Sequence, residues 1–135
     1  MWIGWPGITG EEGLHEPIPE GTKAVGYTLK PVLLNREEHD KFYYGFSNEV
    51  VWPLFHDLQD RCNFDPEYWD AYLKVNGKYA EVIAESTSTN DFIWVHDYHL
   101  MYVAQALRES GVRAPIGFFP KGCVRPRSPS VPHRG

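Results

Sequence analysis

The alternation of apolar and polar residues predicts a strand, a helix and a second strand near the end of the chain. Residues 92–96, "FIWVH", form an apolar run of strand length after the polar loop at 86–91, and such a run is typical of a buried strand. Residues 99–110 carry apolar side chains at helical spacing and stop at Gly111, and 114–119, "APIGFF", form another short apolar run. We therefore expect a βαβ unit with two parallel strands and a right-handed crossover.

Two helical segments precede this unit. Residues 36–58 are expected to form a helix in two pieces, with Ser47 as the N-cap of the second piece and Pro53 in its first turn. The second segment has Asp65 as its N-cap and Pro66 at its first helical position. Its apolar face is predicted to contain Trp69, Tyr72, Leu73, Ala80 and Ile83.

Shorter elements are expected near the N-terminus. Residues 1–10, "MWIGWPGITG", indicate a short strand or loop that enters a turn at the Pro6–Gly7 pair. Residues 11–23 are acidic and contain prolines, which favours an exposed loop, and 27–35 favour an edge strand because Pro31 has no backbone N–H. The pattern by itself predicts an α/β domain with a crevice for a polar ligand.

Length and composition indicate one globular domain. The 135 residues include 42% hydrophobic and 15% aromatic residues, which is enough to bury a core. The net charge is −5, and residues 120–135 hold four basic residues and no acid, so residues 1–119 carry −9. An acidic body argues against nucleic-acid binding, which depends on Lys and Arg at the phosphates.

The cysteines and the apolar runs bear on the compartment. Cys62 and Cys123 have no spacing typical of a zinc site or a disulfide framework, which favours a reducing compartment. No apolar run approaches the length of a membrane span, and the first residues lack a signal-peptide pattern. We therefore expect a cytoplasmic protein with no membrane contact.

Asp97 lies within "IWVHDYHLM", directly after the predicted strand at 92–96. Ligands of open α/β sheets bind beyond the carboxyl ends of the strands. Asp97 could therefore accept hydrogen bonds from sugar hydroxyls or cap the following helix, and both uses stay open. A metal site with His96 and His99 is not expected, because this spacing across a turn does not bring three ligands together.

Aromatic residues offer a second candidate surface. Trp5 and Trp52 could pack in the core or against the apolar face of a sugar ring. Tyr43 and Tyr44 could seal the edge of a core or offer a hydroxyl to a phosphate. Since the dinucleotide, P-loop, serine-hydrolase and zinc-peptidase motifs are all missing from the sequence, none of those chemistries is expected and no cofactor is predicted.

Between Trp2 and Phe119 the chain contains, in this order, the blocks "WIGWPG", "KPVLLN", "FYYGFSNEVVWPLFH", "WDAYLKVNGKYAEVIAE", "IWVHDYHLM" and "IGFF". The blocks and their order resemble the trehalose-6-phosphate synthases, which are retaining glycosyltransferases of the GT-B fold with two Rossmann-like domains. The resemblance implies transfer of glucose from UDP-glucose to glucose 6-phosphate, giving trehalose 6-phosphate and UDP without a metal. It also implies that residues 1–119 are a partial N-terminal, acceptor-binding Rossmann-like domain, with parallel strands and flanking helices.

The same resemblance assigns four substrate-binding residues and no catalytic residue. Trp5 in "GWPG" matches a tryptophan that lines the acceptor site, and Tyr43 in "FYYGF" matches a tyrosine that binds the phosphate. Trp52 in "VVWPLFH" matches a tryptophan beside the acceptor that is linked to anomer selectivity. Asp97 in "HDYH" matches the carboxylate that hydrogen-bonds the acceptor sugar.

Residues 120–135 do not match the family, which continues after "IGFF" with Leu-His-Ile-Pro-Phe-Pro. Their four prolines and four basic residues predict a disordered tail. An upstream arginine, a Gly-Gly loop and the donor-binding domain of the family have no counterpart here, so UDP-glucose binding and activity are expected only together with that domain.

Other interpretations of the chain stay open. The alternative is a non-catalytic homologue that binds glucose 6-phosphate or regulates a larger synthase complex. A homo-oligomer is a further option. Poor folding is another expectation, because a sheet with open strand edges is prone to aggregate.

Overall fold

The structure is a computed structural model that describes residues 1–7, 9 and 26–120. The exposed loop predicted at 11–23 lies outside the described residues. The same holds for the disordered tail predicted at 120–135, apart from Pro120, and for Cys123. Those expectations stay predictions.

The predicted βαβ unit is present. Strand β3 spans Ile93–His96 and pairs in parallel with strand β4, Ile116–Phe119. Between them lie a short 3-10 helix, η5, at Tyr98–Leu100 and helix α4 at Val103–Glu109. The chain leaves α4 through Gly111, whose φ of +85° is easily adopted only by glycine.

Strand β3 is buried on one face only. Ile93 and Val95 are buried and belong to the same core cluster as Val103 and Leu107. Trp94 between them is 62% exposed, because successive side chains of a strand point to opposite faces. The strand predicted to be buried is therefore buried on one face and exposed on the other.

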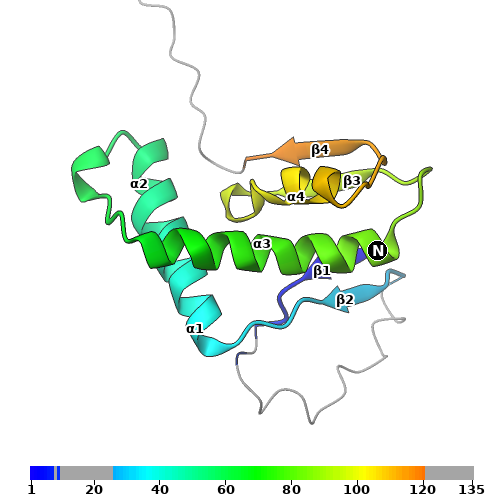
Figure 1. The fold of residues 1–135 in the computed structure, drawn as a ribbon, viewed down its shortest axis with the longest axis horizontal. Helices are drawn as coiled ribbons and strands as arrows, with labels where there is room; N and C mark the ends of the chain where they lie inside the picture. The colour runs from blue at the N-terminus through cyan, green and yellow to red at the C-terminus, as the bar shows by residue number, and fades with distance from the viewer. Residues whose placement is uncertain (8, 10–25, 121–135) are drawn as a thin grey trace, which may run out of the picture.

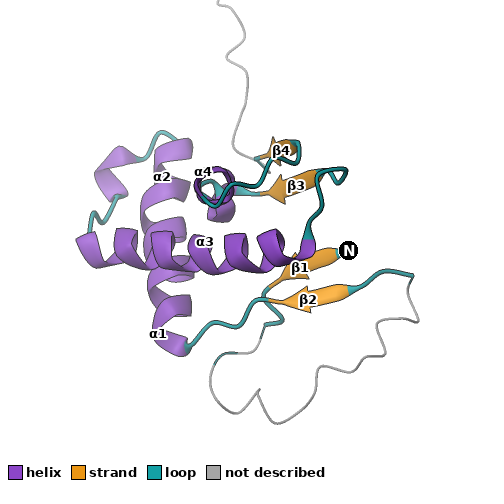
Figure 2. Ribbon diagram, turned by 45° about the vertical axis from the view of Figure 1, so that its right-hand side comes forward, coloured by secondary structure: helices purple, strands orange, loops and turns teal. Residues whose placement is uncertain are grey.

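A second pair of strands lies near the N-terminus. Strand β1, Trp2–Gly4, pairs in parallel with strand β2, Leu29–Pro31, and a turn follows β1 at Gly7. Strand β2 is an edge strand, as predicted, since β1 is its only partner among the described residues. The described part of the chain thus holds two separate two-stranded sheets, and their strands run in the same direction (Figure 2).

The first helical region is continuous. Helix α1 spans Arg36–His39, the π-helix η3 spans Asp40–Val51, and helix α2 spans Trp52–Phe55. The backbone stays in the right-handed helical conformation at both junctions. A short 3-10 helix, η4, follows at Gln59–Arg61.

The prediction that Ser47 caps a helix is wrong. Ser47 is fully buried inside η3, where the preceding turn is already helical and leaves no free helix start to cap. The region begins instead at Asn35, whose side chain accepts a hydrogen bond of 2.8 Å from the N–H of Glu38. Glu38 in turn accepts one of 3.1 Å from the N–H of Asn35, which completes a capping box. Pro53 lies at the start of α2, as predicted.

Helix α3 spans Pro66–Ser86, and its N-cap is Asp65, as predicted. The carboxylate of Asp65 accepts a hydrogen bond of 2.9 Å from the N–H of Glu67. Of the predicted apolar face, Tyr72, Ala80 and Ile83 are buried, Leu73 is half-buried and Trp69 is 44% exposed. Trp69 lies in the first turn, where its ring stacks on that of Tyr72 at the rim of the core.

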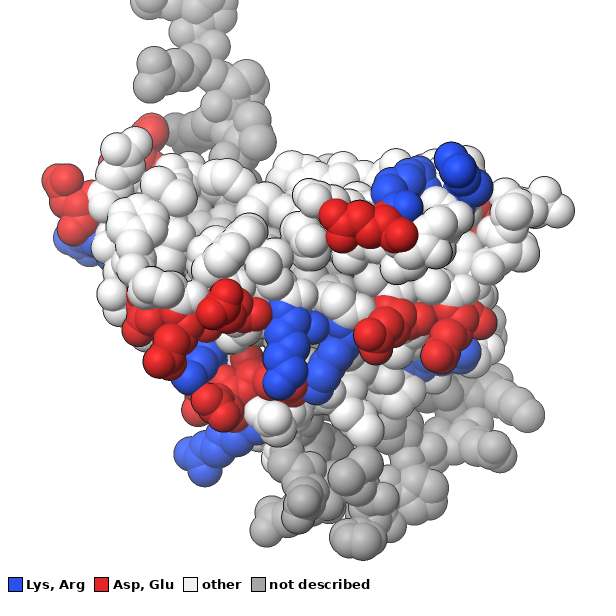
Figure 3. Space-filling model, in the orientation of Figure 1, with Lys and Arg blue, Asp and Glu red and all other residues white. Residues whose placement is uncertain are grey.

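Helix α3 crosses the middle of the molecule, with β3, β4 and α4 on one side and β1 and β2 on the other (Figure 1). Helix α3 packs against η3, α4 and β1, and its buried side chains form part of the hydrophobic core. Acidic and basic side chains are interspersed along its outer face (Figure 3). None of the helices in the described ranges is both long enough and apolar enough to span a lipid bilayer.

Candidate functional site

A cavity of about 620 Å³ lies between β1 and β3 and extends beyond their carboxyl ends. It is lined by Trp5, which follows β1, by Asp97, which follows β3, and by Tyr43 of η3. The fold therefore brings together three of the four residues expected to bind substrate. We call the part of the cavity around Trp5, His39, Tyr43, Asp97 and His99 the polar end.

Asp97 has a strained backbone at this end. Its φ of +75° and ψ of 159° lie in a region that is almost restricted to glycine. Its Oδ1 accepts a hydrogen bond of 2.8 Å from the N–H of Tyr98, so the capping use is realised. Its Oδ2 lies 3.6 Å from Nδ1 of His99, which is too long for a good hydrogen bond, so this oxygen retains capacity for a ligand hydroxyl.

Stacked rings form one wall of the polar end. The indole of Trp5 lies against His39, with ring centroids 4.4 Å apart and planes inclined by 33°. His39 lies 5.4 Å from Tyr43 at 9°, and Tyr43 lies 5.0 Å from His99 at 15°. His39 was not among the residues predicted to bind substrate. Its position four residues before Tyr43 on a predicted helix was the available signal, since such residues share a helix face.

Trp5 is held in place by helix α3. Its backbone N–H donates a hydrogen bond of 3.0 Å to the hydroxyl of Tyr79, which is 74 positions away in the sequence. Burial raises the pKa of the Tyr79 phenol, so the hydroxyl stays protonated and neutral near neutral pH. This contact fixes the chain just beyond β1.

Helix α3 also holds the turn that contains Asp97. The hydroxyl of Tyr72 donates a hydrogen bond of 2.8 Å to the carbonyl of Tyr98 and accepts one of 3.0 Å from the N–H of Met101. The side-chain amide of Asn76 donates one of 3.1 Å to the carbonyl of His99. Burial raises the pKa of Tyr72 to about 12, so this anchor does not ionise near neutral pH. These supporting roles were not predicted.

His99 is a half-buried imidazole that lines the cavity. Its Nε2 is buried and has no hydrogen-bond partner among the described residues. Burial lowers the pKa of His99, and the nearby Asp97 carboxylate offsets this only in part. The ring is therefore mainly neutral at pH 7.

Trp52 lies elsewhere. It is 42% exposed and stacks on His56, with ring centroids 4.1 Å apart, and it does not line the cavity. Tyr44, next to Tyr43, is 57% exposed and does not line it either. The substrate role assigned to Trp52 by resemblance stays a prediction.

The charge of the cavity limits its chemistry. Among the described residues that line it there is no Lys or Arg, whereas His39, His96 and His99 all contribute. The described ranges also contain no group of three or more His, Cys, Asp or Glu side chains placed to hold a metal ion. The arrangement suits a polyhydroxyl ligand, with a carboxylate for its hydroxyls and flat rings for its apolar face.

Known proteins resemble this chain over most of its length. The model of glycosyltransferase family 20 matches residues 1–121. The bifunctional trehalose-6-phosphate synthase/phosphatase of Thermoproteus tenax is 38% identical over 119 residues, which cover 88% of this chain and 16% of that protein. The trehalose-6-phosphate synthase of Salmonella arizonae is 40% identical over 119 residues, covering 88% of this chain and 24% of that protein.

A solved structure of a trehalose-phosphate synthase also resembles this chain. The α,α-trehalose-phosphate synthase (UDP-forming) of Burkholderia xenovorans, in complex with glucose-6-phosphate, superposes with a TM-score of 0.74 at 38% identity. The match covers 89% of this chain and 26% of that one. The predicted α/β fold, part of a Rossmann-like domain, is confirmed by this similarity. The chain spans between 16% and 26% of the length of these relatives. The family match and the identity levels together show that the chain belongs to glycosyltransferase family 20.

Proposed function

We propose that this chain is the acceptor-binding part of a trehalose-6-phosphate synthase and holds glucose 6-phosphate at the polar end of its cavity. In the whole protein, glucose passes from UDP-glucose to the anomeric hydroxyl of that acceptor, giving trehalose 6-phosphate and releasing UDP. The name of a relative in Dictyostelium discoideum, α,α-trehalose-phosphate synthase (UDP-forming) A, supports a UDP-linked donor. The acceptor is the ligand of the Burkholderia xenovorans relative.

The convergence of Trp5, Tyr43 and Asp97 on one cavity carries this proposal. These residues come from three separate parts of the sequence, and each has a chemical use toward a phosphorylated hexose. Oδ2 of Asp97, which has only a long contact of 3.6 Å to His99 Nδ1 among the described residues, accepts hydrogen bonds from ring hydroxyls. The indole of Trp5 packs on the apolar face of the sugar, and the hydroxyl of Tyr43 donates to a phosphate oxygen.

The sugar contributes more than the phosphate to binding by the described residues. No Lys or Arg lines the described cavity, and an Arg–phosphate pair is the strong way to bind a phosphate. We therefore expect that the chain binds glucose 6-phosphate weakly and binds glucose only slightly less well. Binding by this chain should also depend little on salt, since few charges are paired.

Titration of the 15N-labelled chain with glucose 6-phosphate tests the proposal. Amide resonances of Trp5, Asp97 and His99 should shift in a saturable way, and Asp97→Asn should weaken binding about tenfold or more through loss of a charged acceptor. Asp57→Asn is the matched control, because Asp57 is the other described aspartate with positive φ, at +58°, and lies away from the cavity. Shifts that do not saturate, or equal weakening by both variants, would refute the assignment.

A further inference from the structure

His39 is a buried histidine in the wall of the polar end. The residue is 9% exposed and lines the cavity. Its ring contacts the indole of Trp5, at 4.4 Å and 33°, and the phenol ring of Tyr43, at 5.4 Å and 9°. Both neighbours were assigned to the acceptor by resemblance, whereas His39 lies outside the blocks that carry that resemblance. A role for His39 must therefore come from its own geometry and chemistry.

The contact with Asp40 determines which ring nitrogen of His39 can accept a hydrogen bond. Nδ1 of His39 lies 3.2 Å from Oδ1 of Asp40. An ionised carboxylate only accepts hydrogen bonds, so Nδ1 carries the hydrogen and donates it to Asp40. In a neutral imidazole the other nitrogen, Nε2, then holds a lone pair and is an acceptor. The hydrogen bonds among the described residues give the His39 ring no partner besides Asp40.

Asp40 holds one edge of the His39 imidazole outside the cavity. The side chain of Asp40 is 53% exposed, and the residue does not line the cavity. The two nitrogens of an imidazole point in different directions, so Nε2 is directed away from the carboxylate that binds Nδ1. Since His39 itself lines the cavity, the edge with Nε2 is the part of the ring that a ligand at the polar end meets.

The polar end thus offers two hydrogen-bond acceptors, Oδ2 of Asp97 and Nε2 of His39. Among the described residues that line the cavity there is no Lys or Arg. Sugar hydroxyls donate hydrogen bonds to acceptors of this kind, whereas the oxygens of a phosphate need donors themselves. The two acceptors therefore suit the ring hydroxyls of a sugar better than its phosphate.

We propose that Nε2 of His39 accepts a hydrogen bond from a ring hydroxyl of the acceptor sugar, and that His39 is a specificity-determining residue for this site. The inference rests on the proposed function, since it assigns a further contact to the same sugar. The rings of Trp5 and Tyr43 hold the imidazole in place, and Asp40 fixes which nitrogen accepts. Because the contact is to the sugar ring, His39 contributes equally to the binding of glucose and of glucose 6-phosphate.

Titration of His39→Phe with glucose and with glucose 6-phosphate tests this inference. The substitution keeps a flat ring against Trp5 and Tyr43 but removes both nitrogens. At pH 8, where histidine side chains are ordinarily neutral, it should weaken the binding of both sugars about fivefold through loss of one hydrogen bond. Tyr44→Phe is the matched control, because the Tyr44 ring meets His39 edge-on at 5.3 Å but does not line the cavity. This variant should bind both sugars as the wild-type chain does.

The imidazole nitrogens of the 15N-labelled wild-type chain report the contact without any substitution. In long-range proton–nitrogen spectra, the Nε2 resonance of His39 should move in a saturable way with either sugar. Nδ1, which stays bound to Asp40, should move far less. His56 is the control, since its Nδ1 donates to the carbonyl of Trp52 at 2.7 Å and the residue does not line the cavity. Its nitrogen resonances should not move.

The possible results separate this inference from the proposed function. If His39→Phe binds both sugars as tightly as the wild-type chain, the role of His39 is wrong and the proposed function stands. A loss with glucose 6-phosphate alone would also overturn the role, because the imidazole would then bind the phosphate. The same holds for a loss without movement of the Nε2 resonance, which would show a structural effect. If the wild-type chain binds neither sugar in a saturable way, the proposed function fails and this inference fails with it.

Discussion

The ring of Tyr43 lies nearly parallel to the imidazole of His99, with centroids 5.0 Å apart and planes inclined by 15°. His39 stacks on Tyr43 as well, at 5.4 Å and 9°. The stack joins the first helical region to the turn after β3. It places the Tyr43 ring beside the imidazole whose Nε2 is buried without a partner among the described residues. The three stacked rings therefore form much of the aromatic surface that a ligand would meet at the polar end of the cavity.

Protonation of His99 should destabilise the fold. Burial lowers its pKa below the ordinary value of 6.5, so the unfolded chain takes up this proton more readily than the folded one. The contribution of neutral His99 to the free energy of unfolding is therefore fully present above pH 6.5. It is lost as the pH falls from 6.5 to the lowered pKa, and the free energy of unfolding then changes by at most about 1.4 kcal/mol per pH unit.

Urea denaturation from pH 7.5 to 5 measures this slope. His99→Gln should flatten it, whereas His56→Gln, which changes the half-exposed stack on Trp52, should leave it unchanged. An identical pH profile for the wild-type chain and His99→Gln would contradict the prediction.

Glycine at position 97 should relieve backbone strain. Asp97 has a φ of +75° and a ψ of 159°, so Asp97→Gly should be more stable than Asp97→Ala by about 1–3 kcal/mol. It should nevertheless lose sugar binding, because the carboxylate is gone. Chemical denaturation and glucose 6-phosphate titration of both variants measure the two effects. Asp57→Gly, at a φ of +58° outside the cavity, is the control and should keep its binding. If Asp97→Ala equals or exceeds Asp97→Gly in stability, the strain argument is wrong.

Removal of the Tyr72 hydroxyl should loosen the turn that holds Asp97. Tyr72→Phe leaves the carbonyl of Tyr98 and the N–H of Met101 without their partner, which costs about 1–3 kcal/mol of unfolding free energy. Faster amide exchange at Met101 should accompany this loss. Tyr102→Phe is the matched control, since among the described residues its exposed hydroxyl donates a hydrogen bond to Glu109 alone, at 3.3 Å. Its removal should change stability by less than about 0.5 kcal/mol. Equal losses for both variants would contradict the anchoring role.

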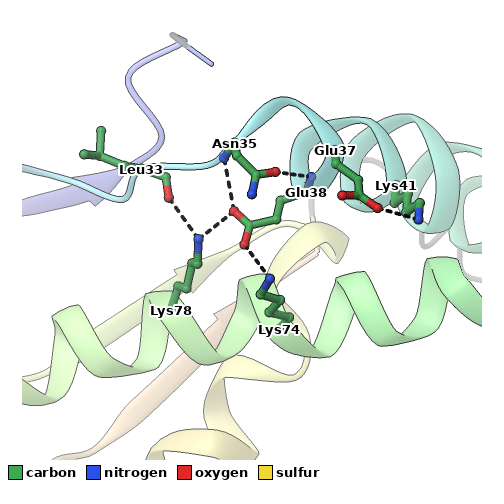
Figure 4. Close-up of polar contacts among 7 residues, drawn as sticks. All are labelled: Leu33, Asn35, Glu37, Glu38, Lys41, Lys74 and Lys78. Atoms are coloured by element: carbon green, nitrogen blue, oxygen red, sulfur yellow. Dashed lines mark hydrogen bonds and ion pairs between the residues drawn. The ribbon is translucent and has the colours of Figure 1, made fainter. Parts of the chain in front are cut away.

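Glu38 should stabilise the packing of α1 on α3 (Figure 4). The carboxylate is buried and forms ion pairs with Lys74, at 3.0 Å, and with Lys78. Burial alone would raise its pKa, but the hydrogen bonds from Lys78, Asn35 and Lys74 outweigh it, and the pKa is lowered from 4.5. This stability is present above pH 4.5 and is lost as the pH falls through the lowered pKa.

Glu38→Gln should therefore cost about 1–3 kcal/mol at pH 7 and flatten the acid limb of the stability profile. The neighbouring Glu37→Gln is the control, because Glu37 pairs with Lys41 at the surface and an exposed pair contributes little. Thermal melts from pH 7 to 3 compare the variants. A larger loss for Glu37→Gln than for Glu38→Gln would be incompatible with this account.

The sequence pattern predicted those elements that are determined by residues close together in the chain. The βαβ unit, the Asp65 cap and the end of α4 before Gly111 follow from apolar spacing, a capping side chain and a residue that tolerates positive φ. The Ser47 prediction failed because a serine acts as a cap only where a helix starts. The helix starts twelve positions earlier, at Asn35, where the reciprocal pair with Glu38 forms.

The sequence by itself determined the family blocks and the candidates Trp5, Tyr43, Trp52 and Asp97, since motif order is written along the chain. Only the tertiary structure decided that three of them share a cavity and that Trp52 does not. It also supplied the contact of His39 with Trp5 and the bond from Trp5 to Tyr79 across 74 positions. Such contacts depend on how distant segments pack, and residue spacing carries no information about the distances that packing creates.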